Sequence, residues 1–136
     1  MSRGPERRAV KQFKAAVAPV ATTAKISTPF LRGVPDLIFS VRSSKYTCLI
    51  EMKADSSPSQ LSTDIRPTKI QLEFMCSWAG DCFVVSKVGR AWGIHRPEFF
   101  LGGSGKVKLK EWKSQSLVSP KTSLEAIATY LCDAPK

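Results

Sequence analysis

Two acidic residues and a lysine interrupt apolar stretches of an otherwise basic chain. Asp36 begins the segment DLIFSV, and Glu51 lies in CLIEMK, which ends in Lys53. A carboxylate among apolar residues costs free energy unless something compensates it. Two such carboxylates could hold a divalent cation through hard oxygen ligands, with the lysine placed to act on whatever that cation binds.

Positioning these residues requires two adjacent strands, which we expect over 35–41 and 46–53 with the turn residues RSSK between them. If the loop is centred on its two serines, Asp36 faces Glu51 across the hairpin with Cβ atoms about 5 Å apart. Lys53 shares that face because side chains alternate along a strand. The apolar residues of both strands then form the opposite face.

Two alternatives to this geometry stay open. An odd-length loop would shift the register by one residue and send one acid to the other face of the sheet. In the second alternative, Asp36 caps the start of its strand and Glu51 pairs with Lys53 at the end of a sheet, with no metal involved.

The remaining pattern predicts α/β or α+β architecture, a central mixed sheet flanked by helices, in a single domain spanning 1–136. A first helix over 5–18 places Glu6 on its apolar stripe. The other expected elements are a strand at 20–27, a helix at 67–79 that buries Ile70, Phe74, Met75 and Trp78, a hairpin at 82–95, a basic strand at 106–110 and a capped helix at 119–131. The pattern determines the secondary structure of residues 102–136 least clearly.

The charge balance indicates which kind of partner the protein binds. With 21 Lys and Arg against 11 Asp and Glu, the net charge is +10, which favours nucleic acid and places an anionic membrane surface far behind it. The apolar run after the basic N-terminus is short and broken by Pro19, so we expect no export, no membrane span and a cytoplasmic protein. Four cysteines and one histidine form no zinc-binding spacing.

Basic residues recur on several expected elements and are the candidate nucleic-acid contacts. On the first helix they form a stripe, and in 106–110 they recur at every second residue, so a strand would carry all three on one side. A solvated helix face and an edge strand protected from aggregation are the ordinary alternatives. The candidates are Arg3, Arg7, Lys11, Lys14, Arg32, Arg66, Lys69, Lys106, Lys108 and Lys110.

The order of the chemical residues resembles the PD-(D/E)xK nuclease superfamily. Within it, the chain is most similar to the virus-type replication-repair nucleases (VRR-NUC) and the Holliday junction resolvases, which have a helix acid, a GxPD turn, an ExK strand and a helix glutamine. Here those pieces are Glu6, Gly33-Val34-Pro35-Asp36, Glu51-Met52-Lys53 and Gln71. The resemblance does not cover the tail from 102 or the insertion 56–67, which we expect to be a flexible substrate-facing loop.

This resemblance implies a restriction-endonuclease-like core and metal-dependent hydrolysis of DNA. Asp36, Glu51, the carbonyl of Met52 and Glu6 would ligate Mg²⁺, or Mn²⁺ in its place. Lys53 would orient the attacking water or stabilise developing charge, and Gln71 would hold Lys53 or the phosphate.

Branched DNA, such as a Holliday junction or a flap, is the favoured substrate, and because the sequence supplies no base-reading motif we expect recognition of the DNA backbone and shape. Symmetric cutting of a junction would need a homodimer, and the resemblance adds a role in recombination or repair and a viral source as expectations. A general DNA-degrading nuclease is the main competitor. A non-catalytic nucleic-acid-binding module is the other alternative, but it would be expected to have lost Asp36, Glu51 or Lys53.

Overall fold

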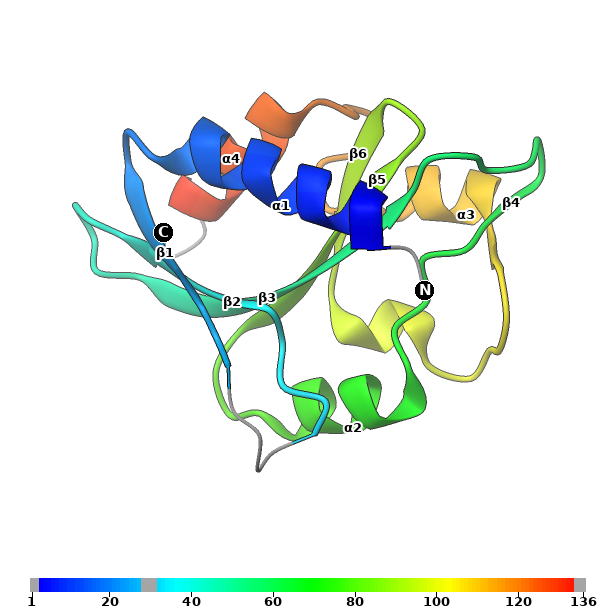
Figure 1. Ribbon diagram of the computed structural model, residues 1–136, viewed down its shortest axis with the longest axis horizontal. Helices are drawn as coiled ribbons and strands as arrows, with labels where there is room; N and C mark the ends of the chain where they lie inside the picture. The colour runs from blue at the N-terminus through cyan, green and yellow to red at the C-terminus, as the bar shows by residue number, and fades with distance from the viewer. Residues whose placement is uncertain (1–2, 28–31, 134–136) are drawn as a thin grey trace.

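A five-stranded mixed sheet forms the centre of the molecule in the computed structural model, which describes residues 3–27 and 32–133. The strands lie in the order β1-β2-β3-β5-β6, with β3 and β5 parallel and the other neighbours antiparallel. This sheet with its flanking helices confirms the predicted architecture (Figure 1). The strands are β1 (Ala21–Lys25), β2 (Leu37–Val41), β3 (Thr47–Asp55), β5 (Cys82–Val88) and β6 (Ala91–His95).

The β2–β3 hairpin has the register that was counted from the sequence. Leu37 pairs with Ile50, and Ser40 pairs with Thr47. Asp36 immediately precedes β2, so the same count places it level with Glu51. The apolar residues of both strands are buried together on the opposite face, as expected: Leu37, Phe39, Val41, Cys48, Ile50 and Met52.

Helices cover both faces of the sheet (Figure 1). On one face lie α1 and α4, and Phe13 of α1 is fully buried with its ring centroid 6.0 Å from that of Phe39. The second core, on the other face, takes residues from α2, η1 and α3. The bounds are α1 (Arg3–Val17), α2 (Lys69–Ser77), the 3-10 helix η1 (Pro97–Phe100), α3 (Leu109–Ser114) and α4 (Leu124–Asp133). Within the described ranges, no helix combines the length and apolarity needed to cross a membrane.

Trp112 anchors the second core. Its indole N–H donates to the Ser86 hydroxyl at 2.8 Å, and its carbonyl oxygen lies 2.8 Å from Nε2 of His95. Gly93 makes room for the ring, because a Cβ there would lie 2.7 Å from an indole carbon. Trp112 and His95 are both almost fully buried, which fixes α3 against β5 and β6.

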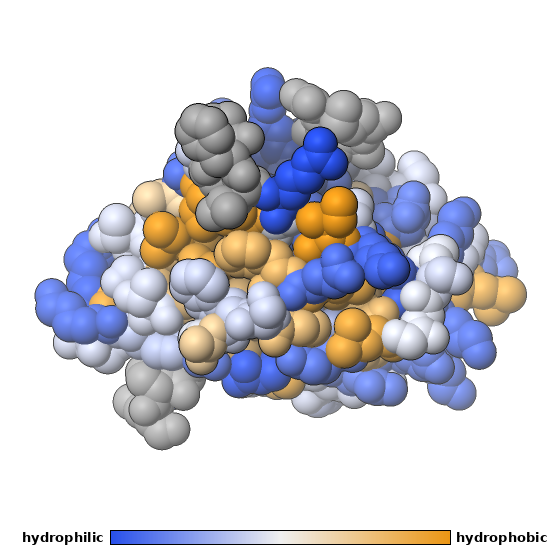
Figure 2. All heavy atoms as spheres, turned by 90° about the horizontal axis from the view of Figure 1, so that it is seen from below, coloured by the Kyte–Doolittle hydropathy of each residue, from blue (hydrophilic) through white to orange (hydrophobic). Residues whose placement is uncertain are grey.

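The inward face of α2 differs from the prediction. Met75 is buried as expected, but its buried companion is Leu72, while Ile70 and Trp78 are 45% and 47% exposed. The face of the molecule seen from below shows apolar side chains at the surface among charged ones (Figure 2). A helix this short has few inward positions, and the rotation that carries Gln71 to Glu51 turns Leu72 inward with it.

The predicted basic strand is also shorter than expected. Only β7 (Val107–Lys108) is extended, and it pairs with β4 (Ser62–Thr63) in a separate two-stranded sheet. Lys110 already belongs to α3, so the three lysines of this segment do not share one side of a strand. The burial of Trp112 explains the change, because a helix over 109–114 turns its ring into the core.

Candidate active site

The turn before β2 fixes Asp36 between two strands. Its carboxylate accepts a hydrogen bond from the N–H of Met52 at 2.9 Å, and its carbonyl accepts one from the N–H of Ile26 at 2.9 Å. Gly33 has a φ of +77°, and a Cβ there would lie 2.5 Å from the carbonyl oxygen of Ile70. The turn therefore lies directly against α2, and only glycine fits at that point.

Glu51 lies in the middle of β3 and is 2% exposed. Its Oε2 accepts a hydrogen bond from Nε2 of Gln71 at 3.1 Å and lies 3.5 Å from Nζ of Lys53. Its Oε1 is buried and has no hydrogen-bond partner among the residues that the structure describes. Such an atom is costly to bury, so Oε1 is the candidate position for a ligand.

The N-terminus of α2 holds Gln71 in place. The Gln71 N–H donates to the Thr68 hydroxyl at 3.2 Å, and the Thr68 N–H donates to the Gln71 side-chain oxygen at 2.9 Å. This capping box uses the oxygen of the Gln71 amide and leaves its NH₂ group to bind Glu51. One side chain thus starts the helix and orients the buried carboxylate.

The electrostatics of the site favour uptake of positive charge. Burial, followed by repulsion from Asp36, raises the pKa of Glu51 to about 8, although Lys53 opposes the change. Burial also raises the pKa of Asp36, against the lowering by the Met52 N–H and Lys53. The pKa of Glu6 is raised by burial too, with Lys53 lowering it and Asp36 raising it. Each acid resists ionisation in its surroundings, and a cation would relieve that resistance.

Glu6 on α1 borders two hollows at the edge of the site. One, of about 240 Å³, is also lined by Lys53, Asp64 and Arg66. The other is shared with Asp36 and with basic residues of α1 and β1. Five predicted site residues are therefore brought to one region: Glu6, Asp36, Glu51, Lys53 and Gln71.

The fold resembles that of known DNA-cutting enzymes. A Holliday junction resolvase from the archaeal hyperthermophile Archaeoglobus fulgidus superposes with a TM-score of 0.55 at 15% identity, covering 90% of this chain and 99% of the resolvase. A bacterial homing endonuclease matches with a TM-score of 0.54 at 15% identity, covering 80% of this chain and 75% of that enzyme. The chain has a nuclease fold of the restriction-endonuclease type.

No family model and no curated protein sequence matches the chain. At 15% identity, what the two solved structures share with it is the nuclease fold.

The donor set of this nuclease fold fits a divalent cation. Asp36 and Glu51 offer carboxylate oxygens, and the unpaired Oε1 of Glu51 is a buried acceptor that a cation would satisfy. In the described ranges, no three His, Cys, Asp or Glu side chains form a group able to hold a metal ion. Glu6 does not complete such a group, so a bound cation would need further ligands, such as the main-chain carbonyl of Met52 or water.

The predicted nucleic-acid contacts lie on both sides of the site. Arg7 and Lys14 line the hollow that contains Asp36, and Lys106 and Lys108 line another hollow together with Arg66. The remaining described candidates are exposed or at helix ends: Lys11, Arg32, Lys69 and Lys110. Arg3 begins α1, but its side chain lies outside what the structure describes.

Arg66 has a structural role in addition to the predicted one. Its guanidinium donates to the carbonyls of Phe100 and Gly105 at 2.5 and 2.9 Å. A Cβ at Gly103 would lie 2.8 Å from the guanidinium, so the main chain of the glycine-rich segment passes close to the Arg66 side chain. Arg66 therefore ties 100–105 to the edge of the site.

Sequence reasoning missed two residues that border the site. Lys25, at the end of β1, lines the hollow beside Asp36, and its charge acts to lower the pKa of that acid. Asp55, at the end of β3, accepts hydrogen bonds from the hydroxyl of Thr63 and the N–H groups of Ser57 and Asp64. Both residues lie at strand ends close to the predicted active-site residues, and this position in the sequence could have identified them.

Proposed function

We propose that this protein is a metal-dependent endonuclease that hydrolyses phosphodiester bonds of DNA. The observation that carries the proposal is the buried Glu51, whose unpaired oxygen lies in a site with Asp36, Lys53 and Gln71. A purely structural ion pair between Glu51 and Lys53 would not need a carboxylate oxygen buried without a donor. The nuclease fold and the net charge of +10 are consistent with a DNA substrate.

Each residue of the site would have a separate role in the reaction. Asp36, Glu51 and the carbonyl of Met52 would hold Mg²⁺ or Mn²⁺, with Glu6 across the hollow. When bound, the cation would lower the pKa of a coordinated water and offset the negative charge of the phosphate. Lys53 carries an ammonium group 3.5 Å from Glu51 and would stabilise the charge that develops on the phosphate. Gln71 keeps Glu51 oriented during the reaction.

Branched DNA is the favoured substrate, and two copies would act together. Backbone and shape recognition suits a basic surface without a base-reading motif. Cutting a four-way junction symmetrically requires two sites, which a twofold dimer supplies. Sedimentation equilibrium of the protein alone and with junction DNA tests this part, and a monomer in both conditions contradicts it.

A cleavage assay tests the activity. Labelled four-way-junction, flap, single-stranded and duplex DNA are incubated with Mg²⁺, Mn²⁺ or EDTA and with wild type, Glu51→Gln or Lys53→Ala. We expect metal-dependent nicking that falls about a hundredfold or more in both variants. Glu73→Gln is the matched control, because Glu73 is exposed on α2. Equal cleavage of all substrates indicates a general nuclease, and binding without cleavage overturns the enzymatic proposal.

Metal binding has a readout of its own. In EDTA at pH 9, above the raised pKa of Glu51, Glu51→Gln should melt at a higher temperature than wild type, because it replaces a carboxylate that is buried and charged at that pH. Adding Mg²⁺ should raise the melting temperature of wild type and of Glu73→Gln while leaving Glu51→Gln unchanged. A similar Mg²⁺ shift in all three proteins would contradict a site at Glu51.

A further inference from the structure

The most exposed large hydrophobic side chain of the described residues is Leu61, which is 81% exposed. It lies at the tip of the segment that joins β3 to α2, outside the part of the chain that carries the nuclease motif. Figure 1 shows this segment, with β4, projecting at one end of the molecule. A single exposed leucine is ordinary on a protein surface, so its meaning depends on how it is held and what surrounds it.

The tip is held by hydrogen bonds. The hydroxyl of Ser59 accepts from the N–H groups of Leu61 and Ser62 at 3.2 and 2.9 Å, and the Ser59 N–H donates to the Ser62 carbonyl at 3.0 Å. The carbonyl of Leu61 accepts from the N–H of Leu109 at 2.9 Å. These hydrogen bonds define a turn within the expected substrate-facing loop, and the turn presents Leu61 in a set direction.

The base of the segment borders the candidate active site. Asp55 accepts hydrogen bonds from the Thr63 hydroxyl and the Asp64 N–H, and these bonds close the base of the segment. The hollow beside Asp55 is also lined by Lys53 and Glu6. A duplex phosphate at Lys53 would thus have this segment as its neighbour.

Lysines lie beside Leu61 on β7, while the acids of its own segment, Asp55 and Asp64, lie at the base of the segment. Ser62, the next residue, pairs with Lys108 of β7. Lys106 and Lys108 line a hollow together with Arg66, whose guanidinium is fixed by main-chain carbonyls. An apolar tip flanked by lysines matches a partner that is negatively charged outside and apolar inside, which is the cross-section of a DNA duplex.

We propose that Leu61 is a wedge that inserts between base pairs at the branch point of DNA and selects branched over linear substrates. Apolar side chains can enter base steps where stacking is already weakened, and a branch point offers such a step. This inference rests on the proposed function, and it assigns to the 56–63 segment the choice of substrate.

The test uses fluorescence of 2-aminopurine placed at the branch point of a four-way junction and, separately, in the middle of one arm, in EDTA so that no cleavage occurs. Wild type should raise the emission at the branch point, where the base unstacks, and leave the arm unchanged. Leu61→Ala should abolish the rise and reduce the preference for junction over duplex about tenfold. Leu61→Phe should keep both.

Two controls separate the wedge from general effects. Leu117→Ala makes the same truncation at a leucine that is 38% exposed and belongs to a different hollow, beside α4, and should behave as wild type. Because the Leu61 side chain is exposed, Leu61→Ala should melt within about 2 °C of wild type. Ser59→Ala, which loosens the turn but keeps Leu61, should give a smaller emission rise.

The outcomes distinguish this inference from the nuclease proposal. Junction binding without an emission rise in wild type, or an unchanged rise in Leu61→Ala, overturns the wedge while Mg²⁺-dependent cleavage can still stand. An emission rise that depends on Leu61 supports the wedge even where no DNA is cut. Failure to bind any DNA overturns both.

Discussion

At the scale of single residues, the site is arranged around one carboxylate oxygen. Oε2 of Glu51 contacts both Gln71 and Lys53, whereas no donor in the described part of the chain reaches Oε1. An unpaired buried acceptor costs roughly 1–3 kcal/mol. A neutral apolar residue would fill the same position in β3 at lower cost, so the side chain is better suited to binding a ligand than to stabilising the sheet.

Gln71→Ala should reduce cleavage more than its effect on stability explains. It removes the amide that orients Glu51 and half of the capping box, so we expect a loss of about 1 kcal/mol and a fall in kcat of about tenfold or more. Thr68→Ala removes the other half of the box and leaves the contacts of Glu51 in place. Denaturant unfolding and single-turnover cleavage compare them, and equal falls in kcat would contradict an orienting role.

His95 should make the fold less stable in mild acid. Burial lowers its pKa from 6.5 to about 4, although the hydrogen bond with Trp112 opposes this. As the pH falls below 6.5, the unfolded chain takes up a proton while the folded chain stays neutral until about pH 4. Stability is therefore full above the unfolded pKa and is lost as the pH falls, by about 2 kcal/mol between pH 7 and pH 5.

Urea unfolding at several pH values measures this effect. His95→Gln can keep a donor for the Trp112 carbonyl but does not titrate, so its stability should change less over the same range. Parallel pH profiles for the two proteins would show that His95 is not the cause.

At the scale of elements, the turn before β2 and the helix α2 position each other. Gly33 lies against the main chain of Ile70, one residue before Gln71. The turn carries Asp36, and the helix carries the partner of Glu51. Their close contact sets both sides of the site at once, which a looser packing of loop on helix could not do.

Gly33→Ala should damage both stability and cleavage, whereas Gly102→Ala should affect stability alone. Both glycines have positive φ, at 77° and 79°, so alanine at either should cost about 1 kcal/mol in backbone strain. Of the two, the new Cβ would collide with a neighbour at Gly33, whereas at Gly102 no atom of the described ranges lies within 4 Å of it. Thermal melts and cleavage rates measured on both variants check this, and equal effects would contradict a tight turn–helix contact.

The sequence was sufficient to predict those elements whose geometry follows from counting residues along the chain. The hairpin register follows from period-two alternation and loop length, so the placement of Asp36 beside Glu51 could be predicted. The inward face of α2 could not, because Ile70 and Leu72 are equally apolar and a short helix carries too few repeats to choose between them. The two-stranded sheet and the Ser59 turn depend on hydrogen bonds to main chain that leave no periodic signal.

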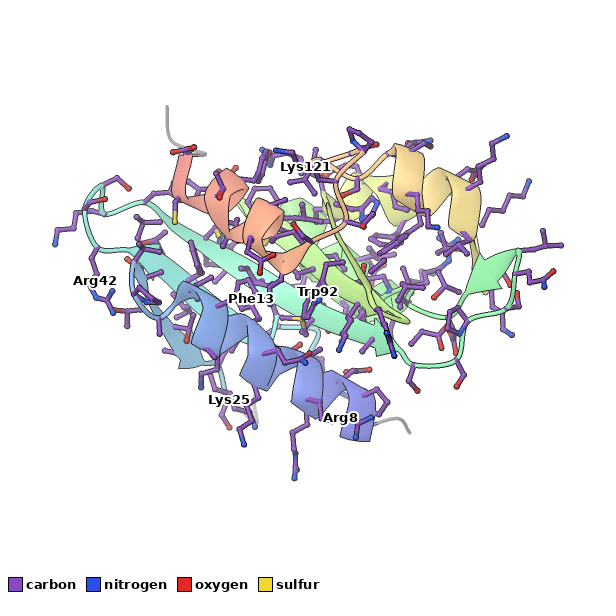
Figure 3. All side chains as sticks on the ribbon, turned by 90° about the horizontal axis from the view of Figure 1, so that it is seen from above. Arg8, Phe13, Lys25, Arg42, Trp92 and Lys121 are labelled. Atoms are coloured by element: carbon purple, nitrogen blue, oxygen red, sulfur yellow. The ribbon has the colours of Figure 1, made fainter. Side chains whose placement is uncertain are left out.

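At the scale of the whole molecule, basic residues flank the site on two sides. Arg7, Lys14 and Lys25 lie on the side of α1 and β1, and Lys106 and Lys108 lie on the side of β7. Figure 3, which looks onto α1 from above, shows Lys25 and Arg8 projecting along the same edge. The arrangement suits a duplex that crosses the site with phosphates held on either side.

Removing Lys106, Lys108 and Lys110 together should weaken the salt dependence of DNA binding. Each phosphate contact that is lost lowers the slope of log K against log salt by about 1, so the triple alanine variant should lose about 2 to 3. Lys45→Asn is the control, because Lys45 lies in the β2–β3 loop at the end of the molecule opposite β4, and asparagine tolerates its φ of 64°. Fluorescence anisotropy at several salt concentrations gives the slopes, and unchanged slopes would remove β7 from the binding surface.

The hydrogen bond from the Met52 N–H to Asp36 gives the site a reporter of its own. Met52 lies in β3 beyond its last pair with β2, Leu37 with Ile50, so its amide depends on the Asp36 side chain instead of a neighbouring strand. In hydrogen–deuterium exchange, its protection would last only while the turn stays docked, whatever the rest of β3 does. A Met52 amide that exchanges faster than those of its strand neighbours would therefore measure how often the two halves of the site separate in the folded protein.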